Sequence, residues 1–246
     1  MHGPDSGTPE YEAQVREVRE LYEQAPALHE AGVHVISTDE KTGIQALERV
    51  AETKPMQSAR EAQRGRAERQ EYEYKRHGTQ CLMANLAVAR GRSLWPSVGA
   101  TRKEEDFVRH LAETVKRDAE GAWIFLADNL NTHQSASLVM WVAQPSGYEG
   151  DLGEKEKHGI LHSMASRAEF LREPGQRIRF VYTPRHSSWL NQVEMWFGVL
   201  ARRLLKRGSF KSVEELRERL LAFIKYYNEN LAKPYKWRYK GRPLQA

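Results

Sequence analysis

Three acidic residues of this sequence occur where carboxylates commonly build a site. Asp39 follows the short apolar run 33–37, Asp128 follows the apolar run 123–127, and Glu194 lies at the start of a segment with helical apolar spacing. Oxygen ligands suit Mg²⁺, which takes one or two carboxylates per ion together with water and phosphate. Two such ions about 4 Å apart can activate an attacking oxygen and stabilise a leaving oxygen in phosphoryl transfer. The three acids therefore indicate metal-dependent phosphodiester chemistry, provided that the fold brings them together.

Each of these acids also has an ordinary structural explanation. A single Asp after a strand is most often a solvated turn residue, and the helix dipole alone favours a carboxylate in a first turn. However, the arrangement of buried strand, acid and polar stretch at Asp39 is repeated at Asp128. The loop edge of a sheet is open to ligands, so two strands that both end on acids favour a shared site.

The elements that must position these acids follow from hydrophobic periodicity and turn residues. Alternating or continuous apolar runs predict strands, and Gly91 marks a hairpin turn. Helical spacing predicts helices, with Thr101 and Ser212 as N-caps and with Pro26 and Gly121 as stops. The predicted strands are 33–37, 80–89, 93–98, 123–127 and 178–183. The predicted helices are 11–30, 101–121, 135–142, 164–171, 191–205 and a last helix after 212. This order is typical of a ribonuclease-H-like α/β fold, with a mixed five-stranded sheet and helices on both faces.

Length and composition agree with a globular intracellular protein. The 246 residues are 40% hydrophobic, which is ordinary for a chain with a buried core. Cys81 is the single cysteine, so an internal disulfide or a cysteine zinc site is excluded. No apolar run approaches ~18 residues, and the first residues lack a signal-peptide pattern. We expect a soluble protein of the cytoplasm.

Three motifs carry a family resemblance: STDEKTG at 37–43, LADNLNTH at 126–133 and TPRHSSWLNQVE at 183–194. They resemble the acidic motifs of DDE transposases, with the greatest likeness to the bacterial insertion sequence 630 family, relatives of the mariner elements. The resemblance runs from about residue 12 to the end and implies a catalytic triad of Asp39, Asp128 and Glu194 that binds two Mg²⁺ or Mn²⁺ ions. It also implies that Asn129 and Asn191 lie beside the acids. The implied reaction is hydrolytic nicking at transposon ends and strand transfer into target DNA, typically at TA, by a homo-oligomer near the nucleoid.

The sequence departs from the family pattern in two places. Glu194 follows Asp128 by 66 positions (194 minus 128), about twice the interval usual in mariner-like members, and we assign the excess to an insertion at about 147–176. The family normally begins with helix-turn-helix modules, whereas the first acidic motif here starts near residue 39. We therefore expect an N-terminal tail and helix at 1–30 (remnant or linker), a catalytic domain at 31–232 and a basic-aromatic tail at 233–246. Without such modules, DNA binding should show little sequence preference.

Clustered cations indicate a polyanionic partner, because the net charge is +5 and is unevenly distributed. We expect DNA contacts from the end of the helix that carries Glu194 and from the loop before it, although cations at a helix C-terminus also suit its dipole. These residues are Arg202, Arg203, Lys206 and Arg207 in the helix and Arg185 and His186 in the loop.

Two further charged segments leave alternatives open. The segment 54–77 is a solvated excursion or a loop that faces nucleic acid. The aromatics of 233–242 either stack on bases or pack onto the domain. His158 and His162 lack the glutamate of the zinc-protease pattern, so we expect them to be exposed.

Two other functions compete with transposition. A non-transposing metal-dependent nuclease of the same fold would use the same acids. A non-catalytic nucleic-acid-binding protein would gain nothing from acids clustered against phosphate, and the three intact acids therefore disfavour it.

Overall fold

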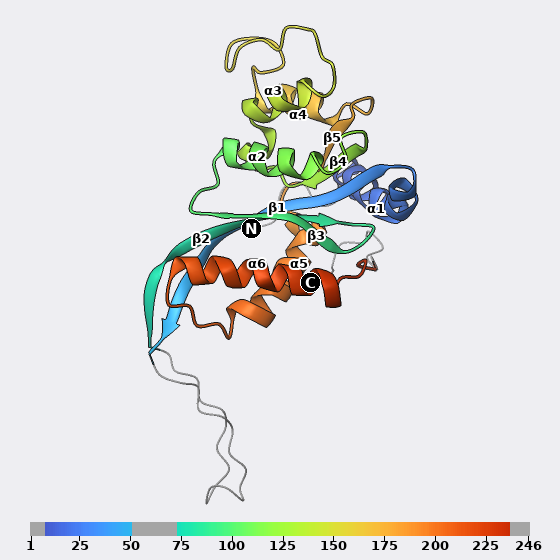
Figure 1. Ribbon diagram of the computed structural model, residues 1–246. Helices are drawn as coiled ribbons and strands as arrows, with labels where there is room; N and C mark the ends of the chain where they lie inside the picture. The colour runs from blue at the N-terminus through green and yellow to red at the C-terminus, as the bar shows by residue number, and fades with distance from the viewer. Residues whose placement is uncertain (1–7, 51–72, 237–246) are drawn as a thin grey trace, which may run out of the picture.

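The computed structural model describes residues 8–50 and 73–236, which form a five-stranded mixed sheet with helices on both faces (Figure 1). The strand order is β3-β2-β1-β4-β5. The strands are β1 (Val33–Arg49), β2 (Tyr74–Ala87), β3 (Arg92–Gly99), β4 (Ala122–Ala127) and β5 (Ile178–Tyr182). The helices are α1 (Pro9–Glu30), α2 (Glu104–Val115), α3 (Ala136–Ala143), α4 (Met164–Arg172), α5 (Gln192–Leu200) and α6 (Val213–Asn230). The predicted fold class is confirmed.

The first strand is much longer than its sequence pattern predicts. β1 continues for ten residues past Asp39, because it pairs antiparallel with β2 as far as Arg49. Its parallel pairing with β4 ends earlier, at Ser37 opposite Leu126. The prediction that Asp39 lies at the C-terminal end of its strand is therefore wrong. Asp39 lies in mid-strand, just past the point where the neighbour β4 ends.

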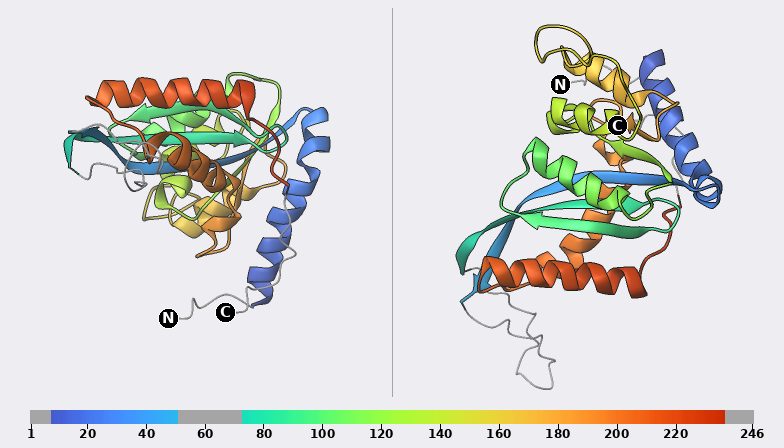
Figure 2. Two further views of the ribbon diagram at one scale, coloured as in Figure 1. Left: turned by 90° about the horizontal axis from the view of Figure 1, so that it is seen from below. Right: turned by 45° about the horizontal axis from the view of Figure 1, so that its top comes forward.

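Three apolar clusters hold the helices to the sheet. On one face, α2, α3 and α4 pack around alternate strand residues such as Phe125 and Phe180. On the other face, α5 and α6 cover β2 through Trp196 and Leu220. α1 covers β4 and β5 on that second face, with Val18 at the contact, and the two views of Figure 2 show it apart from α6. Burial of alternate residues on both faces is what the continuous apolar run of β4 predicts.

Several predicted boundaries differ in the structure. α1 ends at Glu30 as predicted, but Pro26 lies inside the helix and does not stop it, and Leu28 beyond the proline still packs in the same apolar cluster. Thr101 is not the N-cap of α2: Lys103 holds that position, and the Thr101 hydroxyl donates to the Asp106 carboxylate at 2.5 Å. Ser212 does cap α6, and α4 begins at the predicted residue.

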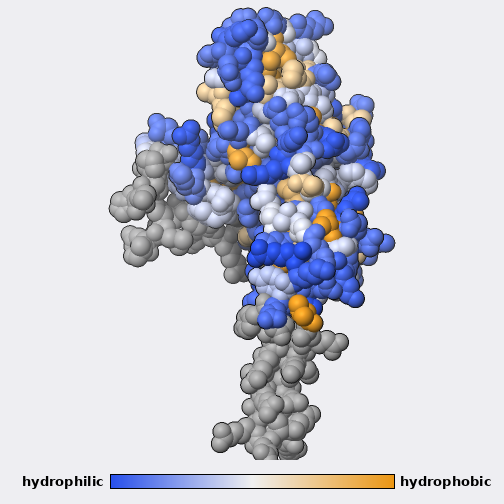
Figure 3. Space-filling model, turned by 90° about the vertical axis from the view of Figure 1, so that its left-hand side faces the viewer, coloured by the Kyte–Doolittle hydropathy of each residue, from blue (hydrophilic) through white to orange (hydrophobic). Residues whose placement is uncertain are grey.

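The predicted charged excursion 54–77 is partly strand, since β2 begins at Tyr74, and its residues up to 72 lie outside the described part of the chain. Across 8–50 and 73–236, no helix is long and apolar enough to cross a membrane. The side of the molecule shown in Figure 3 is mainly hydrophilic, with apolar residues in small separate patches.

Candidate active site

Asp39 and Asp128 lie together at the end of the parallel strand pair. Each lies two residues beyond the last pairing of β1 with β4, so the register places them side by side. One oxygen of each carboxylate and one ring nitrogen of His133 all lie within 4.8 Å of one another. These atoms form the one group of metal-ligand type in the described residues, and Glu194 is not a member of it.

His133 is held between two carboxylates. Its Nδ1 lies 2.7 Å from Oδ1 of Asp128, and its Nε2 lies 2.9 Å from Oε2 of Glu40. The imidazole is 0% exposed and the Glu40 side chain 1% exposed. Burial by itself would lower the pKa of His133, but the two carboxylates outweigh it and raise the pKa to about 10. His133 is therefore an imidazolium whose two N–H groups both donate, which leaves no lone pair for a metal ion.

The charge of His133 divides the acids into two kinds. Burial tends to raise the pKa values of Asp128 and Glu40, but their contacts with His133 lower both overall. Asp39 has no such hydrogen bond, so its burial, with the charge of Asp128 nearby, raises its pKa to about 8. A buried carboxyl group of this kind is stabilised in its charged form by a cation.

The residues present fit a hard divalent cation. Oδ1 of Asp128 is occupied by the amide of Leu130 at 3.0 Å and by His133, so its other oxygen remains for a ligand. Asp39 supplies a second carboxylate whose charge requires compensation. Carboxylate oxygens with no thiolate or neutral imidazole are the donor set that Mg²⁺ and Mn²⁺ prefer.

The start of α5 is anchored beside Asp39. The buried Asn191 side chain donates to the carbonyl oxygen of Thr38 at 3.0 Å and to Oδ2 of Asp39 at 3.3 Å. Its oxygen accepts from the hydroxyl of Ser37, which in turn accepts from the amide of Val193 at 2.8 Å. Glu194 is the next residue, exposed, in the first turn of this helix.

Three other predicted site residues, Asn129, Arg185 and His186, line a large groove next to Asp128. Asn129 donates to the carbonyl oxygen of Thr183 at 2.6 Å and so ties the loop after β4 to the end of β5. Arg185 and His186 are exposed at the same groove. We call it the α1–α4 groove, because the first residues of α1 and one side of α4 form its walls.

The second group of predicted DNA-contacting residues forms a separate surface. Its cations follow α5 in the π-helical turn Ala201–Leu205 and just beyond it. They line a hollow with Phe223 and the half-exposed Tyr226 of α6. These cations are Arg202, Arg203, Lys206 and Arg207. As expected, His158 and His162 are exposed.

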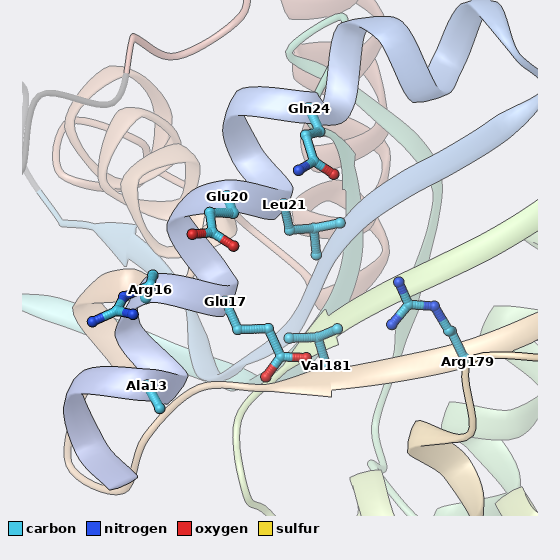
Figure 4. Close-up of a pocket in the computed structure, with 8 residues that line it drawn as sticks. All are labelled: Ala13, Arg16, Glu17, Glu20, Leu21, Gln24, Arg179 and Val181. Carbon is cyan, nitrogen blue, oxygen red and sulfur yellow. The ribbon is translucent and has the colours of Figure 1, made fainter. Parts of the chain in front are cut away.

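A smaller hollow lies between α1 and the edge strand β5. Arg16, Glu17 and Glu20 of α1 surround it together with Arg179 of β5 (Figure 4). Its charges are mixed and none of the clustered acids lines it, so it offers no comparable chemistry.

Glu40 and His133 are the site residues that sequence reasoning missed. Both occur within the motifs that carry the resemblance, next to Asp39 and five residues after Asp128. Strand alternation directs Glu40 away from Asp39 and towards the face covered by α2–α4, where the 3-10 helix Asn131–Gln134 presents His133. Once β1 is known to continue past Asp39, alternation along the strand identifies the face on which Glu40 lies.

Fold and site together define a ribonuclease-H-like α/β domain with an acidic centre at the end of its central strands. The Mos1 mariner transposase in a paired-end complex with Mn has a similar structure: TM-score 0.53 and 12% identity over 92% of this chain and 58% of that chain. Thus, the chain spans little more than half the length of that transposase. The catalytic domain of the Mos1 mariner transposase aligns with a TM-score of 0.48 and 12% identity, over 91% of this chain and 85% of that chain.

The sequence places the chain in a family. The profile of the DDE superfamily endonucleases matches residues 48–217, which include Asp128 and Glu194, whereas Asp39 precedes them. The chain therefore belongs to the DDE superfamily of endonucleases. No curated protein matches it by sequence.

Proposed function

We propose that the chain is the catalytic domain of a DNA transposase of the insertion sequence 630 family, which cuts transposon ends and joins them to target DNA. The observation that carries the proposal is the convergence of Asp39 and Asp128 at the end of the parallel strand pair, in a chain of the DDE superfamily. In-line displacement at phosphorus requires charge compensation on both the attacking and the leaving oxygen. A pair of buried and half-buried carboxylates is suited to hold the cations that provide it.

Asp39, Asp128 and Glu194 are the proposed catalytic and metal-binding residues. Glu194 is included because the helix that carries it is anchored to Asp39 through Asn191. When bound, two Mg²⁺ or Mn²⁺ ions supply activation of the attacking oxygen and stabilisation of the leaving oxygen.

The surrounding residues of the chain orient these acids. Asn191 fixes one oxygen of Asp39, and His133 fixes one oxygen of Asp128. Asn129 keeps the loop after Asp128 in place. Arg185 and His186 are exposed in the groove that begins at Asp128, where they can contact phosphate oxygens.

The proposed partners are duplex transposon ends and a target that contains TA, bound by a homo-oligomer in the bacterial cytoplasm, near the nucleoid. The similar Mos1 transposase forms a paired-end complex, which supports this assignment by analogy. Within the chain, 31–232 is the proposed catalytic domain with an insertion at about 147–176. Residues 1–30 serve as a linker or remnant, and 233–246 as a basic-aromatic tail.

A plasmid assay tests this function. Supercoiled DNA with candidate ends is incubated with the full chain and Mg²⁺, Mn²⁺ or EDTA, and nicked and joined products are scored. Asp128→Asn should abolish cleavage and retain DNA binding, whereas Asp151→Asn, the same change in the exposed insertion, should leave both unchanged. Cleavage in EDTA or by Asp128→Asn would refute the proposed chemistry. Nicking without joined products at any end sequence would favour the non-transposing nuclease.

A further inference from the structure

The segment at about 147–176, which we assign to an insertion between β4 and β5, packs against the loop that carries Asp128. Arg167 of α4 is 7% exposed, and its guanidinium donates to the carbonyl oxygen of Gln134 at 2.7 Å and to that of Leu161 at 2.8 Å. Gln134 ends the 3-10 helix that presents His133, and its side chain donates to Asn129 at 3.2 Å. A buried guanidinium that satisfies two carbonyl groups holds α4 in a fixed position relative to Asp128.

The fixed helix forms one wall of the α1–α4 groove. Met164, Ala165, Ala168 and Arg172 of α4 face the groove, and Glu10 belongs to the opposite wall formed by α1. Figure 2 (right) shows the first turns of α1 beside α4. The end of β5 forms the floor of the groove. Asp128 and the exposed loop that follows β5 also line the groove.

The chemistry of this lining fits a phosphate backbone. Arg172 lies with its guanidinium carbon 5.6 Å from the ring centroid of Tyr182, so the planar cation is held over the floor of the groove. Arg185 adds a guanidinium on the Asp128 side, His186 adds a ring N–H that can donate to phosphate, and Glu10 is the opposing acid. The two arginines, Arg172 and Arg185, outnumber this one acid. Asp128 is not counted here, because the proposed metal ions would neutralise its charge.

We propose that the α1–α4 groove binds the sugar–phosphate backbone of the DNA strand next to the cleaved bond, and that Arg172 of the insertion contacts one of its phosphates. This rests on the proposed function. The insertion is then a substrate-binding wall, and the DNA strand reaches Asp128 between α4 and α1.

Salt dependence of binding tests the phosphate contact. The full chain is titrated with labelled duplex in EDTA by fluorescence anisotropy between about 0.05 and 0.5 M salt. Each phosphate contact adds about 0.9 to the slope of log K against log salt, so Arg172→Gln should reduce the slope by about 0.9. If the contact contributes nothing at 1 M, binding at 0.1 M falls about eightfold. Glu10→Gln on the opposite wall should strengthen binding.

The matched control is Lys155→Gln, which removes the same charge from an exposed position of the same insertion outside the groove. Its slope should match that of the wild-type chain. Equal slopes for Arg172→Gln, Lys155→Gln and the wild type would overturn the proposal, and so would a reduction of equal size in the two variants.

Crosslinking provides a second, independent measurement. Benzoylphenylalanine at position 168, on the groove side of α4, should crosslink to the DNA strand, and the same group at position 155 should not. A crosslink from position 168 to a second copy of the chain, in place of DNA, would refute the assignment. If the wild-type chain neither binds nor cleaves DNA, the proposed function itself fails. If it does both and only the Arg172 and position 168 results are negative, the groove assignment alone fails.

Discussion

Replacement of His133 by alanine should be among the most destabilising single changes at this site. The imidazolium lies 2.7 Å from Asp128 and 2.9 Å from Glu40, and the Glu40 side chain is almost completely buried. Without His133, the Glu40 carboxylate keeps only weak polar neighbours in the Thr132 hydroxyl at 3.5 Å and the Asp39 carboxyl group, and no cation among the described residues. Removal of one partner from a buried ion pair costs about 3–5 kcal/mol, since the remaining charge stays buried without compensation. We expect this loss in the free energy of unfolding.

The assay is urea unfolding at pH 7 in EDTA, so that metal binding does not contribute to stability. The control is His34→Ala, which removes an imidazole from a pair with Asp118 at the similar distance of 2.8 Å, but with partners that are 18% and 42% exposed. An exposed pair of this kind contributes little to stability, because solvent screens it. A loss for His133→Ala no larger than that for His34→Ala would refute the buried-pair interpretation.

A double variant and a pH series separate charge from packing. Glu40→Gln in the His133→Ala background removes the stranded charge and should recover part of the loss, with a coupling of about 0.5–3 kcal/mol. The folded-state pKa of His133 is raised to about 10. Its stabilisation is therefore fully present below its unfolded pKa of about 6.5 and is lost as the pH rises through about 10. The difference in the free energy of unfolding between the wild type and His133→Ala should therefore decrease as the pH rises from about 6.5 to about 10.

Three further predictions concern groups outside this pair. Asn191→Ala leaves the buried Ser37 hydroxyl without its acceptor and should lower the free energy of unfolding in urea by about 1–3 kcal/mol. It should also weaken Mn²⁺ binding measured by calorimetry. An unchanged Mn²⁺ affinity would contradict the role of Asn191 in orienting Asp39. Burial lowers the pKa of His110 to about 3, so the unfolded chain takes up a proton below about pH 6.5 and stability falls as the pH decreases. Between pH 6.5 and 5 this amounts to about 2 kcal/mol, and His110→Gln should lose that dependence in pH-resolved melts. Gly91→Ala should destabilise the hairpin by at least about 1 kcal/mol, because this residue has φ +62° and the new Cβ would meet the Lys233 carbonyl group. An unchanged melting temperature would refute this prediction.

The sequence predicted the fold better than it predicted the site. Periodicity is a local property, and it was sufficient for β4, β5 and the start of α4. The length of β1 depends on its pairing with β2, which no pattern around Asp39 reveals. The Glu40–His133 contact joins residues 93 positions apart, and its existence depends on the position of the 3-10 helix after β4.

The position of Glu194 shows the same limit. Its helix and its place in the first turn were predictable, because the apolar residues of α5 have clear helical spacing. The anchoring of that helix through Ser37 and Asn191 was not predictable, because this hydrogen bond joins side chains that are 154 positions apart. Local spacing identifies an element, and only packing determines what its polar residues contact.

The segment that we assign to an insertion, at about 147–176, lies in the crossover from β4 to the parallel strand β5. The pairing of these two strands does not depend on the length of the connection between them. Doubling a flexible connection costs only about 0.6 kcal/mol in closure entropy. Relatives can therefore shorten, extend or replace this crossover while the acids at the strand ends keep their positions. The part of the molecule that we assign to holding the DNA strand can thus diverge at a different pace from the part that we assign to cutting it.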